Sequence, residues 1–330
     1  MKRSSLFGHR EVSLFLILIF TIGLTSFINP RFVTGSGTRD LFNATAVVAI
    51  MAVGITPIVI MKHIDLSIAS IVGFSAWLIA DLCAKHPWFT TWHAFIVGPL
   101  VGAAVGVLNG FLVAGLRLPA LVVTLGTLYI VRGLDYVVSN SVDYNAQDLP
   151  KSMVALGEKT YFGLLPFPFL LVLIFMITAG LYMRYRKPGR DRYAIGSNAH
   201  AAELVGIKVF QRTFLAFVFS GATAGLAGVL YLMRFAQVDA TAFYGQELGV
   251  VAAVVIGGIS INGGIGTPYG AVIGALLVQS IQGGLSALGV DAFWKQAING
   301  TLLIIALFAD RVLARRAEQA LLAQRIKERA

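Results

Sequence analysis

Long apolar segments separated by short polar joints dominate the chain. A helix that spans a bilayer needs about 20 mostly apolar residues, and ten segments come close to that length. They cover residues 12–28, 43–62, 64–83, 94–116, 118–138, 164–183, 213–233, 246–264, 267–288 and 293–309. The pattern predicts an all-α integral membrane protein of about ten transmembrane helices.

Two joints in this pattern are unusual. The second and third segments meet at "KHI", and the eighth and ninth meet at the glycine-rich "NGGIG". Joints this short also fit broken or re-entrant segments in place of complete spans.

Basic residues lie mostly on one side of the predicted membrane. With the N-terminus inside, 18 of the 26 lysine and arginine residues fall in cytoplasmic pieces. Those pieces are residues 1–11, the joints at Lys62 and Arg117, the loop 184–212 and the tail 310–330. This asymmetry follows the positive-inside rule. It predicts an even number of spans with both termini cytoplasmic.

Composition supports the same class. The chain is 57% hydrophobic and 13% charged, whereas a soluble domain carries about 25% charge. The net charge of +10 is therefore mostly an orientation signal and does not indicate nucleic acid. We expect a membrane domain over residues 1–310 and a basic cytoplasmic tail over 311–330. The basic residues and apolar run at the N-terminus are followed by no small-x-small cleavage site, so we expect a retained first span.

Glycines recur every four residues in two predicted spans. One set is Gly98, Gly102, Gly106 and Gly110, and the other is Gly266, Gly270 and Gly274. On a helix this spacing makes one flat face that another backbone can approach closely. We interpret both sets as structural helix contacts.

Polar residues inside the spans are the candidates for a translocation path. Asp65 and Ser67 stand at the start of the third span, and an ionised group there must face protein or water. Arg132 and Asp135 are spaced i, i+3 and can pair on one face of a helix. These residues fit either a polar path or caps and an internal ion pair. The path candidates are Asp65, Ser67, Asn109, Thr124, Thr127 and Arg132.

Motifs for catalysis and for metal or nucleotide binding are not found in the sequence. It has no HExxH, GxSxG, CxxC or Walker phosphate loop. Its one cysteine, Cys83, fits a small apolar filler. We therefore expect neither an enzyme nor a cofactor in this chain.

The loop between the sixth and seventh segments contains a short helix pattern, "NAHAAELVG". Asn198 can cap its start and Gly206 can end it. Ala201, Leu204 and Val205 would share one face. A helix this short is marginal alone in water, so it needs a surface. The pattern leaves two surfaces open, a soluble partner or the membrane boundary.

Four stretches resemble one family. They are "IDLSIAS" (64–70), "NGFLVAGLRLPALVVTLGTLYIVRG" (109–133), "GRDRYAIGSNAHAAELVGI" (189–207) and "VVAAVVIGGISINGGIGTPYGAVIGALL" (250–277). In order and spacing they are similar to the membrane subunit of ribose-type bacterial ABC sugar importers. The resemblance runs from about residue 43 to 310. Lys62 and His63 stand where that family usually has Gly-Gly.

The resemblance implies a multi-pass permease of the bacterial inner membrane that imports a monosaccharide or related small polyol. It implies a cytoplasmic ABC ATPase that holds ATP and Mg²⁺, an extracytoplasmic sugar-binding protein, and a second permease copy or homologue in the lipid bilayer. The loop would then be the coupling helix, with its contacts at Asn198, Ala201, Ala202, Glu203 and Gly206. The alternative is an ion-coupled secondary transporter of a small solute, which would rely on Asp65, Arg132 and Asp135.

Overall fold

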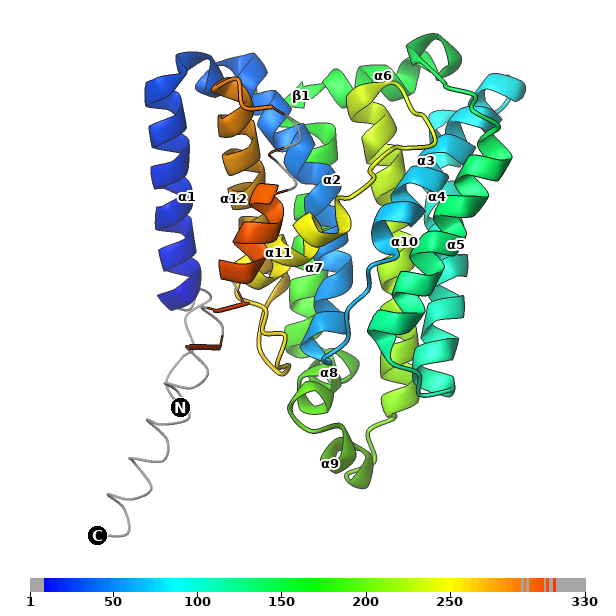
Figure 1. Ribbon diagram of the computed structural model, residues 1–330, viewed down its shortest axis with the longest axis vertical. Helices are drawn as coiled ribbons and strands as arrows, with labels where there is room; N and C mark the ends of the chain where they lie inside the picture. The colour runs from blue at the N-terminus through cyan, green and yellow to red at the C-terminus, as the bar shows by residue number, and fades with distance from the viewer. Residues whose placement is uncertain (1–8, 292–293, 295–296, 306, 309–310, 313–330) are drawn as a thin grey trace.

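The computed structural model describes residues 9–291, 294, 297–305, 307–308 and 311–312, which form a bundle of long helices (Figure 1). The long helices are α1 (His9–Ile28), α2 (Gly35–Ile60), α3 (Ile68–Lys85), α4 (Thr91–Gly110), α5 (Ala120–Ser139), α7 (Phe167–Tyr185), α10 (Val209–Phe235) and α12 (Pro268–Ala287). The short elements are η1 (Pro30–Val33), η2 (Phe111–Gly115), η3 (Ala146–Asp148), α6 (Lys151–Glu158), β1 (Thr160–Tyr161), β2 (Leu165–Pro166), α8 (Lys187–Ser197), α9 (Ala199–Leu204) and α11 (Glu247–Ile256).

Seven of the described helices are long and apolar enough to cross a membrane. They are α2, α3, α4 with its π-helical continuation η2, α5, α7, α10 and α12. The expectation of an all-α membrane protein is confirmed. The count of ten spans stays a prediction, because α1 has a shorter apolar stretch at 14–28 and candidate 293–309 lies partly outside the described residues.

The predicted span 246–264 is wrong as a complete helix. It contains α11, which has 10 residues and is about 15 Å long, half of the roughly 30 Å hydrocarbon core. Gly258, at φ +93°, turns the chain out of the helix. A Cβ on Gly257 would lie 2.2 Å from the carbonyl oxygen of Gly270. The broken-segment alternative therefore describes this place.

The chain is also non-helical between α2 and α3. Lys62 has a left-handed φ of +67°. The carboxylate of Asp65 accepts a hydrogen bond from the backbone N–H of Ser67 at 3.0 Å, a local turn that competes with helix. The third span therefore begins at Ile68, later than the predicted 64.

Helix α2 runs through the middle of the bundle (Figure 1). All of its residues from 43 to 60 are buried, which is possible because the helix is apolar all round. Its two inner threonines donate to their own helix, Thr45 to the Leu41 carbonyl at 2.8 Å and Thr56 to the Ala52 carbonyl at 2.6 Å. This helix is the fixed centre against which α7, α10 and α12 pack.

The first glycine stripe forms the contact between α4 and α10. A Cβ on Gly102 would lie 1.9 Å from the carbonyl oxygen of Gly221, and a Cβ on Gly225 would lie 1.9 Å from that of Gly98. The two backbones therefore touch directly, as predicted for a stripe of small residues. The second stripe is partly wrong, because Gly266 precedes α12 and has φ +134°.

The two ends of the bundle differ. Helices α8 and α9 project from one end, which is also where α1 begins and α2 finishes (Figure 1). Helix α6 and the β1–β2 hairpin lie at the opposite end (Figure 1). The end with α8 and α9 carries the basic loop 184–212, so the positive-inside rule assigns it to the cytoplasm. This orientation stays a prediction.

Candidate functional site

Helices α8 and α9 fold the loop between α7 and α10 into a compact unit. Asn198 stands between them, and its side-chain oxygen accepts a hydrogen bond from the backbone N–H of Ala201 at 3.0 Å. Gly206 lies beyond the end of α9 with φ +80°, a conformation that favours glycine. The short helix with this cap and this end is confirmed.

The tip of α9 exposes apolar side chains. Leu204 is 76% exposed and Val205 is 77% exposed. Glu203 also points outward, with its carboxylate 3.9 Å from the guanidinium of Arg117. Ala202 differs from the other predicted coupling residues, because it is buried in the small core that packs against α10. Ala202 therefore anchors α9, while its neighbours are free to meet another surface.

The unit is joined to the bundle through backbone. A Cβ on Gly196 would lie 1.8 Å from the carbonyl oxygen of Ile60, at the end of α2. The N–H of Gly264 donates to that same oxygen at 2.9 Å. The hydroxyl of Tyr193 donates to the carbonyl of Gly266 at 2.9 Å, and burial raises the pKa of Tyr193 to about 12. We call these contacts the α8 joint.

The broken segment before α3 carries a buried polar network. Asp65 accepts hydrogen bonds from the Ser67 hydroxyl at 2.6 Å and from the Ser220 hydroxyl at 2.8 Å. The amide of Asn109 donates to the Ser67 hydroxyl at 2.9 Å. The hydroxyl of Thr124 reaches the Ile64 carbonyl at 3.2 Å. These predicted path residues meet, but all are almost wholly buried, and their contacts fasten the segment to α4, α5 and α10.

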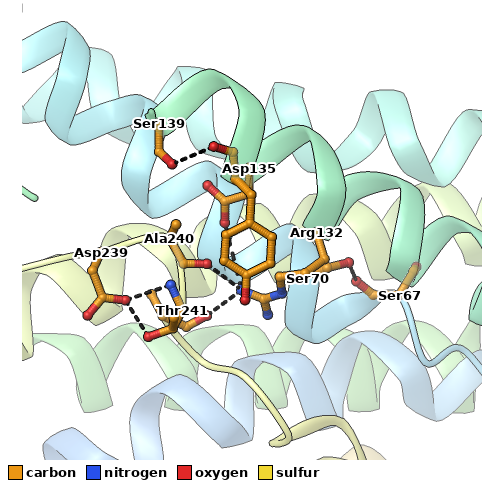
Figure 2. Close-up of polar contacts among 10 residues, drawn as sticks. Ser67, Ser70, Arg132, Asp135, Ser139, Asp239, Ala240 and Thr241 are labelled. Carbon is orange, nitrogen blue, oxygen red and sulfur yellow. Dashed lines mark hydrogen bonds and ion pairs between the residues drawn. The ribbon is translucent and has the colours of Figure 1, made fainter. Parts of the chain in front are cut away.

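Arg132 and Asp135 pair on one face of α5, as their spacing predicts. Arg132 Nη1 lies 3.7 Å from Asp135 Oδ2. The same nitrogen donates to the carbonyls of Ala240 at 3.3 Å and Ala242 at 3.0 Å (Figure 2). The segment between α10 and α11, residues 236–246, is thereby held to α5. Thr127, by contrast, bonds to its own helix through the Val123 carbonyl.

Residues 236–246 form a wall with fixed shape. Tyr144 and Val238 exchange two backbone hydrogen bonds of 3.0 and 2.9 Å. Asp239 accepts bonds of 2.6 Å from both the N–H and the hydroxyl of Thr241 (Figure 2). Phe243 adopts a left-handed φ of +59°, which costs a non-glycine residue about 1–2 kcal/mol. We call this segment the cavity wall, because one side of it faces an open space.

That space is a cavity of about 600 Å³. It lies between the wall, α2, α10 and α12 and is lined by several aromatic and polar side chains. They include Phe32, Asp40, Tyr231, Arg234, Asp239, Phe243, Tyr244, Gln246, Gln279 and Gln282. None of these residues was a sequence candidate. Gln279 and Gln282 are polar at i, i+3 inside an apolar span, and that signal could have found them.

A second cavity, of about 910 Å³, lies beside α9, at the end of the bundle that carries α8 and α9. Lys62, His63, Arg117 and Glu203 line it together with apolar residues of η2 and α5. Burial lowers the pKa of His63, so this histidine favours its neutral form. The α8–α9 unit thus borders a partly basic cavity.

Among the residues that the structure describes, no group of three or more His, Cys, Asp or Glu side chains is placed to hold an ion.

Sequence comparison places this architecture among transport proteins. The family model described as "Branched-chain amino acid transport system / permease component" matches residues 37–307. The L-arabinose ABC transporter permease protein AraH of Azospirillum brasilense is 32% identical over 304 residues, covering 91% of this chain and 86% of AraH. The autoinducer 2 import system permease protein LsrC of Enterobacter sp. strain 638 is 32% identical over 93% of this chain and 88% of LsrC. The ribose import permease protein RbsC of Escherichia coli K12 is 30% identical over 89% of this chain and 92% of RbsC. No solved structure matches.

Proposed function

This chain belongs to the family of branched-chain amino acid transport system permease components, and we propose that it carries a monosaccharide or related small polyol across the bacterial inner membrane. It is the permease subunit of an ABC transporter. The relatives AraH, LsrC and RbsC are named for arabinose, autoinducer 2 and ribose, and these names favour sugar-like cargo over an amino acid.

The exposed tip of α9 is the observation that carries the proposal. Leu204 and Val205 present apolar surface at the basic end of the bundle, on a helix of six residues. Such a helix needs a surface to stabilise it, and the permease itself buries only Ala202. A cytoplasmic ABC ATPase supplies that surface in our proposal. An extracytoplasmic sugar-binding protein and a second permease copy or homologue complete the transporter.

In this mechanism, ATP binding moves the ATPase domains together and carries α9 with them. The α8 joint passes that displacement to the end of α2 and to the segment 257–267, which leads back into α11. The groups that an ion-coupled transporter would use are engaged elsewhere. Asp65 accepts bonds from two serine hydroxyls, and Arg132 holds the cavity wall.

Exchanging both Leu204 and Val205 for aspartate tests the docking role. Burying one such side chain stabilises an interface by about 1.5–3 kcal/mol, so the double variant should weaken ATPase binding at least tenfold. The measurement is copurification of the ATPase with the permease, together with ATP-dependent sugar uptake. Phe162→Asp is the matched control, because Phe162 is 93% exposed in the hairpin loop at the opposite end.

The control should retain both the ATPase and uptake. Unchanged copurification and uptake in the double variant would contradict the assignment of α9 as the coupling helix.

A further inference from the structure

The cavity beside the wall extends from the end opposite α9 to the middle of the bundle. Gly37, near the start of α2, and Val48, near its middle, both line it. They are separated by about 16 Å along the helix, at 1.5 Å per residue. Gln246, which immediately precedes the half-length α11, also lines the cavity. In transporters, a broken helix at the depth of the bilayer midplane commonly borders the solute site.

The charged residues of this cavity lie at its accessible part. Asp40, Arg234 and Asp239 are exposed and line it from three different elements. Two carboxylates and one guanidinium give the rim both acceptors and donors. The rim therefore suits a solute that offers hydroxyl groups, each of which both donates and accepts.

Amides and aromatic rings line the rest of the cavity together with apolar residues of α2. Gln279 is only 9% exposed although it faces this polar space. Gln282 donates its amide N–H to Asn299 at 2.7 Å, which orients its carbonyl oxygen. The rings of Tyr231 and Phe243 stand edge to face, 6.2 Å between centroids. Planar amides beside aromatic faces match the hydroxyl edges and the C–H faces of a compact ring.

We propose that this cavity is the solute site of the permease and that it takes an uncharged polyhydroxylated molecule of monosaccharide size. The inference rests on the proposed function and assigns to it a place and a set of residues. A volume of about 600 Å³ lies within the usual range for small-molecule sites. Arg132, through its bonds to the carbonyls of Ala240 and Ala242, positions the wall of this site.

A branched-chain amino acid would leave the buried amide of Gln279 unpaired, although Leu41, Ala44, Val47 and Val48 give the α2 side of the cavity an apolar lining. Leaving that amide without a partner would oppose binding. Leucine is therefore the competing solute against which the proposal is tested.

Thiol labelling tests the place of the site. Ser286 lines the cavity, and cysteine differs from serine by one atom, so Ser286→Cys in a Cys83→Ser background introduces a single reporter. The complex, in right-side-out membrane vesicles, is treated with a membrane-impermeant thiol reagent. Labelling is repeated with D-ribose, L-arabinose, L-rhamnose, xylitol or L-leucine. Phe162→Cys is the control, because it lies outside the cavity at the same end.

We expect the reagent to label both cysteines, and at least one of the sugars or xylitol to slow labelling of Ser286→Cys alone. Protection by leucine only would overturn the solute class. If none of the compounds slows labelling of Ser286→Cys, the site is overturned. It is also overturned if the reagent labels Phe162→Cys but does not label Ser286→Cys.

Uptake kinetics give a second readout. Gln279→Leu removes the buried amide at similar size, so the half-saturation concentration for sugar should rise about three- to tenfold, the equivalent of one lost hydrogen bond. Gln237→Leu is the control, because Gln237 is exposed in the wall but does not line the cavity. Equal kinetics in both variants would refute the site yet leave wild-type ATP-dependent uptake intact. If the wild type shows no ATP-dependent uptake at all, the proposed function itself fails.

Discussion

The contact between α4 and α10 allows a sharp test of the packing. Gly102→Ala adds a Cβ that would lie 1.9 Å from the Gly221 carbonyl oxygen, whereas ordinary contact is 3.4–4 Å. The two backbones must separate by about 1.5 Å, and a gap of 0.5–1 Å already forfeits a quarter to a half of the dispersion attraction. Overpacking of this kind costs typically about 1–3 kcal/mol.

Helix propensity acts in the opposite direction and supplies the control. Alanine is favoured over glycine in a helix by about 1 kcal/mol. Gly126 lies inside α5, and a Cβ there would meet nothing within 4 Å. Gly126→Ala should therefore leave stability unchanged or raise it, while Gly102→Ala lowers it.

The assay is the thermal unfolding midpoint of the purified permease in lipid nanodiscs. At about 2.1 cal/mol/K per residue, the 330 residues of this chain correspond to a shift of about 1.4 °C per kcal/mol. We therefore expect Gly102→Ala to unfold roughly 1–4 °C below the wild type. A midpoint equal to that of Gly126→Ala would refute the direct backbone contact.

Two further predictions concern the cavity wall and the α8 joint. Arg132→Leu leaves the buried Asp135 carboxylate without its ion pair. The unfolding midpoint of this single variant should therefore lie below that of the double variant Arg132→Leu/Asp135→Leu. A single variant with the higher midpoint would contradict a stabilising ion pair. Burial raises the pKa of Tyr193 to about 12, which predicts stabilisation that is complete below about pH 10 and lost as pH rises through 12, because burial disfavours the charged phenolate. Tyr193→Phe should flatten this pH dependence of the midpoint, and an unaltered dependence would contradict it.

Sequence patterns predicted those features that depend on local chemistry. Apolar length identified most spans, and the spacing of Gly98, Gly102 and Gly106 identified a close helix contact, because a stripe on one helix face needs no knowledge of its partner. The N-cap at Asn198 was likewise predicted from neighbouring residues alone. The pairing of Arg132 with Asp135 also followed from spacing along one helix.

Features that depend on distant segments were not predicted. The end of α11 follows from the approach of Gly257 to Gly270, and hydropathy cannot register such a contact. The second role of Arg132 depends on carbonyls more than a hundred residues away. The cavity collects single polar residues from four elements, so no one stretch of sequence carries its pattern. Ser220, which completes the network around Asp65, was overlooked for the same reason.

The α8 joint has a mechanical consequence. Where side chains separate two elements, rotamer changes can absorb a small displacement before it travels further. At Gly196 the backbone of α8 rests directly on the Ile60 carbonyl, which also receives the N–H of Gly264. No side chain therefore separates α8 from the central helix at this point. If α9 docks on the ATPase as we propose, little of its displacement is lost to rotamer changes before it reaches α2.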